Sequence, residues 1–186
     1  GGLFGSFLYR GAAAFAPVRW RSFIRRHLLV VAFVMGILLA LLGTFYQGKT
    51  YGTGYHEAAA ALKGAYEAPF GLAAAKWAAT VFSYWAGIPG GIFTPSLTIG
   101  AMIGEHIASF AQLGDASNVA VLLCMAAFLA AATQSPLTAA VVVMEMTGGQ
   151  NLLFWMLLTC IFASQVSRQF SPHPFYHAAG LRFRRH

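Results

Sequence analysis

The stretch Gly87-Ile88-Pro89-Gly90-Gly91-Ile92-Phe93-Thr94-Pro95 lies between two strongly apolar segments and crowds glycine and proline together. A helix break at membrane depth is costly, because freed backbone groups find no water there, and it persists where it is buried in protein or lines a hydrated cavity. The sequence that follows, 96–108, is predicted to be helical, and residues 91–95 then form the first turn of that helix. A helix start carries unpartnered N–H groups and partial positive charge, so this one is a candidate anion site. An ordinary loop between two spans is the alternative that the residues leave open.

Composition places the chain among integral membrane proteins. Hydrophobic residues make up 58% of it and charged residues 9%, whereas soluble domains have about 25% charged residues. The surplus of basic residues gathers in two short clusters, 19–26 and 182–185, which is typical of the cytoplasmic flanks of apolar spans. Nearly everything between the clusters is apolar, so no nucleic-acid partner is expected. The predicted location is multi-pass in a bacterial inner (plasma) membrane.

The apolar segments predict the helices. Two have spanning length, 28–45 and 70–86, close to the ~20 residues that cross a bilayer. The second contains Lys76, which we expect to face protein, water or an interface and not lipid. A helix over 92–113 carries Gly100 and Gly104 at a spacing that permits close helix contact, with the general frequency of glycine in membrane helices as the alternative explanation. The other predicted helices are 2–16, 57–65, 119–133, 136–146 with Pro136 in its first turn, and 152–170 with Asn151 as its cap.

The polar residues form no enzyme motif. His56-Glu57 lacks the second histidine of a zinc-protease helix, and Glu105-His106 is an isolated pair. The chain contains neither Gly-x-Ser-x-Gly nor a phosphate-binding loop. We therefore expect no enzymatic activity, no metal site and no cofactor. Partial helices beside helix breaks are instead a pattern of transport proteins built from inverted repeats.

Several motifs follow one another in an order that resembles one family. Residues 87–95 are similar to a GxFxP region, and 135–138 (Ser-Pro-Leu-Thr) with 143–147 (Val-Met-Glu-Met-Thr) are similar to an APLT…LEMT segment. Residues 52–55 (Gly-Thr-Gly-Tyr) and 174–176 (Pro-Phe-Tyr) are similar to a glycine-rich turn and to a stretch with a pore tyrosine. In this order the motifs resemble the CLC chloride channels and proton-coupled chloride transporters, over nearly the whole chain.

The resemblance implies an all-α integral membrane fold of broken and partial helices, the second inverted repeat of a CLC-type membrane domain. Residues 1–186 are then expected to be the C-terminal half of that domain, without the first half, which the chain requires, and without CBS domains. In the family, amides at the GxFxP helix start and a tyrosine hydroxyl coordinate the central anion. The implied residues are Ile92, Phe93 and Tyr176 as anion ligands, with Gly90, Gly91, Thr94 and Pro95 completing the helix-start motif. An interfacial belt tyrosine is the alternative for Tyr176.

The implied function is transmembrane transport of chloride or another small anion, with lipid as the surroundings and a homodimer through 136–146 and 152–170. Whether the protein is a passive channel or a proton-coupled antiporter stays open, because in the family the gating and proton-path glutamates belong to the first half. Glu145 takes neither role and is expected to be structural, bonding to a helix end. Gln134 stands where many members carry arginine. The alternatives are a fluoride-selective member of the family and a non-transporting membrane subunit or scaffold of the same fold.

Overall fold

The computed structural model describes residues 1–10, 26–64, 69–87 and 90–171, and every regular element in those ranges is a helix. The all-α prediction is therefore confirmed. The α-helices are α1 (Gly2–Arg10), α4 (Leu28–Phe45), α5 (Tyr55–Leu62), α6 (Leu72–Trp85), α7 (Phe93–Phe110), α8 (Ser117–Thr133), α9 (Pro136–Thr147) and α10 (Leu153–Phe170), with short 3-10 turns at Gly114–Ala116 and Gln150–Leu152.

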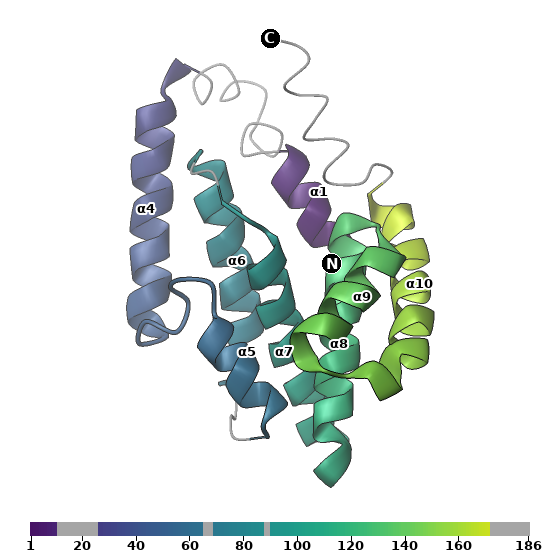
Figure 1. Cartoon of the computed structure of the whole chain (residues 1–186). Coiled ribbons are helices and arrows are strands. Elements are labelled where there is room, and N and C mark those ends of the chain that lie inside the picture. Colours follow the sequence, from purple (N-terminus) through teal and green to yellow (C-terminus); the bar gives the residue numbers. More distant parts are fainter. Residues whose placement is uncertain (11–25, 65–68, 88–89, 172–186) are drawn as a thin grey trace.

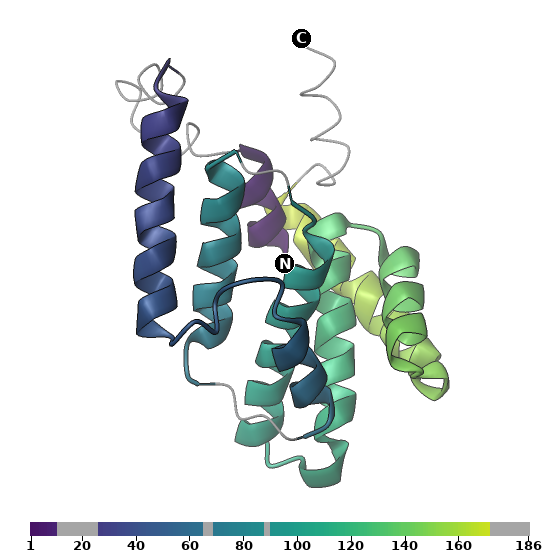
Figure 2. The ribbon, with the colours of Figure 1, turned by 60° about the vertical axis from the view of Figure 1, so that its left-hand side comes forward.

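The helices form a bundle with α7 and α8 at its centre (Figure 1). Helices α9 and α10 pack on the α8 side, while α6 packs against α7 and α4 follows beyond α6. The turned view in Figure 2 shows α4 as the outermost helix of that flank. Helix α5 rests on α7, and α1 contacts α6, α8 and α10. The helix that follows the glycine-proline break is thus enclosed by its neighbours.

Helices α7 and α8 approach so closely that their backbones touch. A Cβ atom added to Gly100 would lie 2.7 Å from the carbonyl oxygen of Cys124, and one added to Gly104 would lie 2.6 Å from the Cα of Val121. Only residues without a side chain allow this approach, as small residues do in membrane helix pairs. The predicted close contact at this glycine spacing is confirmed.

Two apolar clusters hold the bundle together. The larger lies among α5, α7, α8, α9 and α10, and it includes Leu129, Val143 and Met156, all fully buried or nearly so. The smaller lies among α1, α6, α7 and α8. Its buried members are Phe4, Leu8, Val81, Ile92, Ile99, Phe128 and Ala132.

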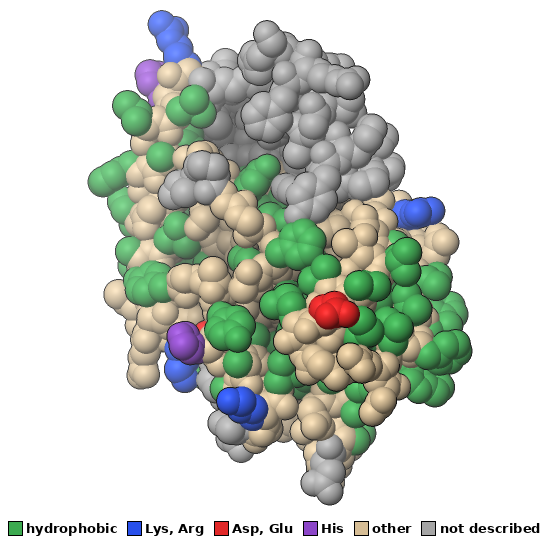
Figure 3. All heavy atoms as spheres, viewed as in Figure 1, with side chains coloured by type: hydrophobic (Ala, Val, Ile, Leu, Met, Phe, Trp, Pro, Cys, Tyr) green, Lys and Arg blue, Asp and Glu red, His purple; other side chains and the backbone are tan. Residues whose placement is uncertain are grey.

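Two segments in the described part of the chain are long and apolar enough to cross a membrane, α4 and 150–170, by length and composition. Only 11% and 22% of their spanning windows are buried, and Figure 3 shows hydrophobic side chains gathered over both flanks of the molecule. The predicted second span over 70–86 is wrong, because α6 has 14 residues. At ~1.5 Å per residue it reaches about 21 Å, short of the ~30 Å hydrocarbon core.

The ends of α9 follow the proline and glycine signals of the sequence, whereas the start of α10 does not. Pro136 occupies the first turn of α9, and Gly148 ends that helix with a φ of 67° that favours glycine. Asn151 is not a helix cap, in contrast to the prediction. It lies within the 3-10 turn 150–152, so Leu152 becomes the residue before α10 and no side chain caps that helix.

Candidate functional site

Helix α7 begins later than predicted, at Phe93, with Ile92 as the residue before it. Gly91 therefore precedes the helix, and Thr94 and Pro95 lie in its first turn. An isoleucine offers no oxygen to the first N–H groups, and this helix start has no side-chain cap. The backbone donors of the start are left to other partners, because the first N–H groups of a helix have no carbonyl within it.

The side chains at this helix start anchor it in both apolar clusters. Ile92 is 3% exposed and belongs to the smaller cluster, while Phe93 packs against the larger one. The Ser96 hydroxyl donates to the carbonyl oxygen of Ile92 at 2.6 Å, and the Ser96 amide does so at 3.0 Å. Two consecutive residues thus point their side chains into packed regions, which fixes the direction of the backbone between them.

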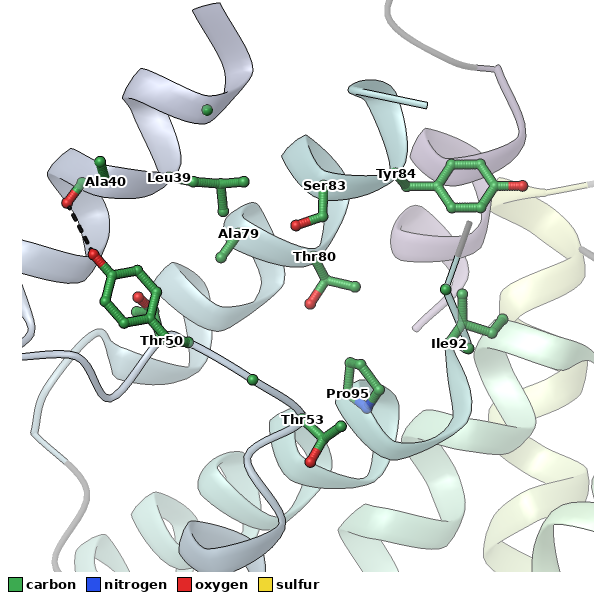
Figure 4. A pocket seen from close by; sticks show the side chains of 15 residues that line it. Leu39, Ala40, Thr50, Thr53, Ala79, Thr80, Ser83, Tyr84, Ile92 and Pro95 are labelled. Atoms are coloured by element: carbon green, nitrogen blue, oxygen red, sulfur yellow. Dashed lines mark hydrogen bonds between the residues drawn. The ribbon is translucent and has the colours of Figure 1, made fainter. Parts of the chain in front are cut away.

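The backbone before α7 lines a cavity of about 550 Å³ (Figure 4). Its other walls come from α4, from the loop between α4 and α5, and from α6. The hydroxyls of Thr80 and Ser83 lie along its wall (Figure 4), and that of Thr80 donates to the carbonyl oxygen of Lys76 at 2.8 Å. A mostly apolar cavity with a few convergent polar groups is typical of ligand sites. The lining residues are Gly36, Leu39 and Ala40; Thr50, Tyr51, Gly52 and Thr53; Ala79, Thr80, Ser83 and Tyr84; and Gly90, Gly91, Ile92 and Pro95.

The glycines of the helix-start motif face open space. A Cβ atom added to Gly90 or Gly91 would have no neighbour within 4 Å among the described atoms, and neither residue has a positive φ. Neither packing against the described residues nor backbone conformation therefore requires glycine at these two positions. Glycine also serves where a ligand or another chain segment approaches the backbone closely.

Lys76 faces protein, as predicted. Its side chain is 1% exposed, and its Nζ donates to the carbonyl oxygens of Thr50 at 3.0 Å, Tyr51 at 3.0 Å and Gly52 at 2.9 Å. These three residues line the cavity as well. Sequence reasoning missed this contact, because the partners are backbone atoms 24 to 26 residues away and no motif marks them.

The remaining predicted residues that the structure describes lie away from the cavity. Tyr176 lies outside the described residues. Gln134 is buried at the end of α8, and its amide Nε2 donates to the carbonyl oxygen of Ser171 at 2.5 Å. Glu145 is exposed on α9 and bonds to no helix end in the described ranges, in contrast to the expectation. A carboxylate oxygen of Glu105 lies 3.3 Å from the Nδ1 of its neighbour His106.

Comparison with known proteins places the chain in a family. Residues 1–168 match the family described as voltage gated chloride channel. The chain is 28% identical over 185 residues to the H(+)/Cl(-) exchange transporter ClcA of Yersinia pestis, covering 96% of this chain and 38% of that protein. It is 39% identical over 108 residues to the voltage-gated ClC-type chloride channel ClcB of Yersinia pseudotuberculosis, covering 54% of this chain and 26% of that protein.

A third relative is an uncharacterized protein of Haemophilus influenzae. It is 64% identical over 59 residues, which are 32% of this chain and 60% of that protein. The chain thus covers less than two thirds of the length of each of these relatives. Since the family match extends over most of the sequence and includes the break before α7, the chain belongs to the voltage-gated chloride channel (CLC) family.

Proposed function

We propose that this protein takes part in chloride transport across a membrane and that the start of α7 forms one wall of its anion site. The observation that carries the proposal is the backbone break at 90–92, which lines a cavity of about 550 Å³ while the adjoining side chains are anchored in the core. The names of the ClcA and ClcB relatives, both chloride proteins, support the same substrate.

The proposed ligands are the backbone N–H groups of Ile92 and Phe93 and the hydroxyl of Tyr176. All three are neutral donors, and the positive end of the 18-residue helix α7 adds to them. A helix dipole contributes roughly 0.3–2 kcal/mol to a nearby anion. That modest attraction suits a conducting site, where the ion must enter and also leave.

We propose that a first half of the membrane domain, outside the sequence described here, supplies the rest of the site. We further propose that the protein forms a homodimer through 136–146 and 152–170. Its proposed location is the bacterial inner membrane. Helices α9 and α10 present outward apolar side chains that suit either a partner or lipid. The exposed ones are Leu137, Val141, Met146, Phe154, Trp155, Leu158, Ile161, Phe162, Val166 and Phe170.

Anion flux from proteoliposomes that contain the complete protein tests the function. Chloride efflux is expected. The absence of chloride, nitrate and fluoride flux would favour a scaffold, and flux of fluoride alone would favour a fluoride-selective member. A pH electrode in the same assay separates the two modes named for the relatives: uphill proton movement driven by a chloride gradient indicates an exchanger, and its absence indicates a channel.

The role of Tyr176 is tested by removing only its hydroxyl. Tyr176→Phe should weaken chloride binding about 10- to 150-fold, since a hydrogen bond to a charged group is worth roughly 1.5–3 kcal/mol. Isothermal titration calorimetry on the complete protein measures the effect. Tyr55→Phe is the matched control, because Tyr55 is 59% exposed at the start of α5. Unchanged binding in Tyr176→Phe would remove this hydroxyl from the site.

A further inference from the structure

Residues 50–53, a short stretch of the loop between α4 and α5, are bonded to both α6 and α7 and are called the strap here. The three donors of the Lys76 ammonium are all used by strap carbonyls, at 3.0, 3.0 and 2.9 Å. Three consecutive carbonyls converge on one nitrogen, so the lysine fixes the course of the strap. The strap keeps this course although the buried Thr50 Oγ1 has no hydrogen-bond partner among the described residues, an arrangement that normally opposes folding.

The other end of the strap is bonded to the first turns of α7. The Thr98 hydroxyl lies 3.0 Å from the carbonyl oxygens of both Thr53 and Thr94 and donates to them as a shared bond. Thr98 is fully buried. A Cβ atom on Gly54, which has a φ of 78°, would collide with the Thr98 side chain. The contacts therefore run from Lys76 through the strap to the turn that begins at Phe93.

The positive charge of Lys76 has no acidic partner in hydrogen-bonding contact. Glu57 is the acidic residue whose charge acts on Lys76, but no carboxylate in the described ranges lies within 4.0 Å of the Lys76 Nζ. Carbonyl dipoles satisfy the donors of the ammonium but do not cancel its net positive charge. In a site of low dielectric constant such a charge acts on ions beyond its immediate contacts.

We propose that Lys76 is a positioning residue for the anion site. It holds the strap, and through Thr98 it fixes the start of α7, while its charge favours an anion in the cavity from behind the strap. The strap carbonyls occupy its donors, so the lysine attracts the anion without binding it directly, which keeps release easy. This inference rests on the proposed function of the α7 start.

The test uses the complete protein and chloride binding measured by calorimetry. Lys76→Met, which keeps the length of the side chain, should weaken binding on the order of tenfold, since both the charge and the strap contact are lost. Thr98→Val keeps the charge and should weaken binding about threefold. The double variant should lose less than the product of the two, because both residues act through one strap.

Two controls separate this role from charge and stability in general. Lys63→Met removes the same charge from an exposed residue at the end of α5 and should leave binding unchanged. Val143→Ala opens the fully buried core of α9, away from the cavity, and should lower the unfolding temperature without changing affinity. Hydrogen exchange should be faster in Lys76→Met at 48–54 and at the start of α7, with α8–α10 unchanged.

Unchanged affinity in Lys76→Met, with wild-type chloride binding intact, overturns the role of Lys76 and leaves the proposed function standing. If Lys76→Met does not fold, Thr98→Val decides, and unchanged affinity in that variant overturns the inference. The absence of chloride binding in the wild-type protein overturns the proposed function, and this inference with it.

Discussion

Two pairs of glycines on and before α7 have opposite surroundings. Gly100 and Gly104, in the body of the helix, have backbone atoms of α8 within 2.7 Å of the position that a Cβ atom would take. Gly90 and Gly91, just before the helix, have no described atom within 4 Å of that position. The first pair lets two helices touch, and the second leaves a stretch of backbone accessible.

The contrast shows how one helix can be tightly packed along its length while the backbone just before it stays accessible. The body of α7 is held by a packed helix interface, which tolerates almost no added volume. The start of the helix is fixed by the side chains of Ile92 and Phe93 and by the Thr98 hydroxyl, while the backbone before it faces the cavity. The same substitution, glycine to alanine, should therefore act on stability in one region and on binding in the other.

The largest effect is expected at the packed pair. Gly104→Ala should lower the free energy of unfolding by about 2 kcal/mol, since its methyl group meets backbone atoms of α8 that move only together with that helix. A circular dichroism melt in detergent measures the change. A stability equal to that of the wild type would mean that α7 and α8 separate easily, and the contrast between the two pairs would fail.

A smaller effect, on binding and not on stability, is expected at the open pair. Gly91→Ala should leave the melting temperature unchanged, because the methyl group has room and the backbone has no positive φ. The methyl group enters the cavity, so chloride affinity should fall about fivefold, or roughly 1 kcal/mol. Calorimetry on the complete protein measures this, and loss of stability together with affinity would contradict the open position.

The smallest effect is expected in α4, where Gly36 also has no atom within 4 Å of an added Cβ. Gly36→Ala should raise the free energy of unfolding by roughly 0.5–1 kcal/mol, since alanine is the better helix former and nothing opposes its methyl group. The same melt measures it. This variant is the control for Gly104→Ala, and a loss of stability here would show that α4 has a closer neighbour.

The sequence predicts elements well where both ends carry a strong signal. The bounds of 28–45 agree with α4, because an uncharged apolar run ends abruptly at both sides. Proline and glycine mark α9 in the same way. The prediction for α6 fails because the apolar composition extends beyond the helix at both ends, while Gly71, the residue before the helix, sets its true start. Composition alone does not distinguish a spanning helix from a shorter one.

The candidate site is predictable only in its local part. The helix start near Ile92 follows from the glycines and proline, which act within a few residues along the chain. The other walls of the cavity come from α4, the strap and α6, which meet only when the bundle forms. The partners of Lys76 are backbone carbonyls, which every residue possesses, so no side-chain pattern predicts them.

The three carbonyls on Lys76 also bear on how the chain enters a membrane. A bare ammonium at the centre of a lone helix costs about 2.5–3.5 kcal/mol on insertion scales, and α6 is too short to offset that cost by its own apolar length. Helix α4, with a mean hydropathy of 2.8 over its span, has no such obstacle. We expect α4, the strap and α6 to insert together, with the lysine already held by the backbone that precedes it.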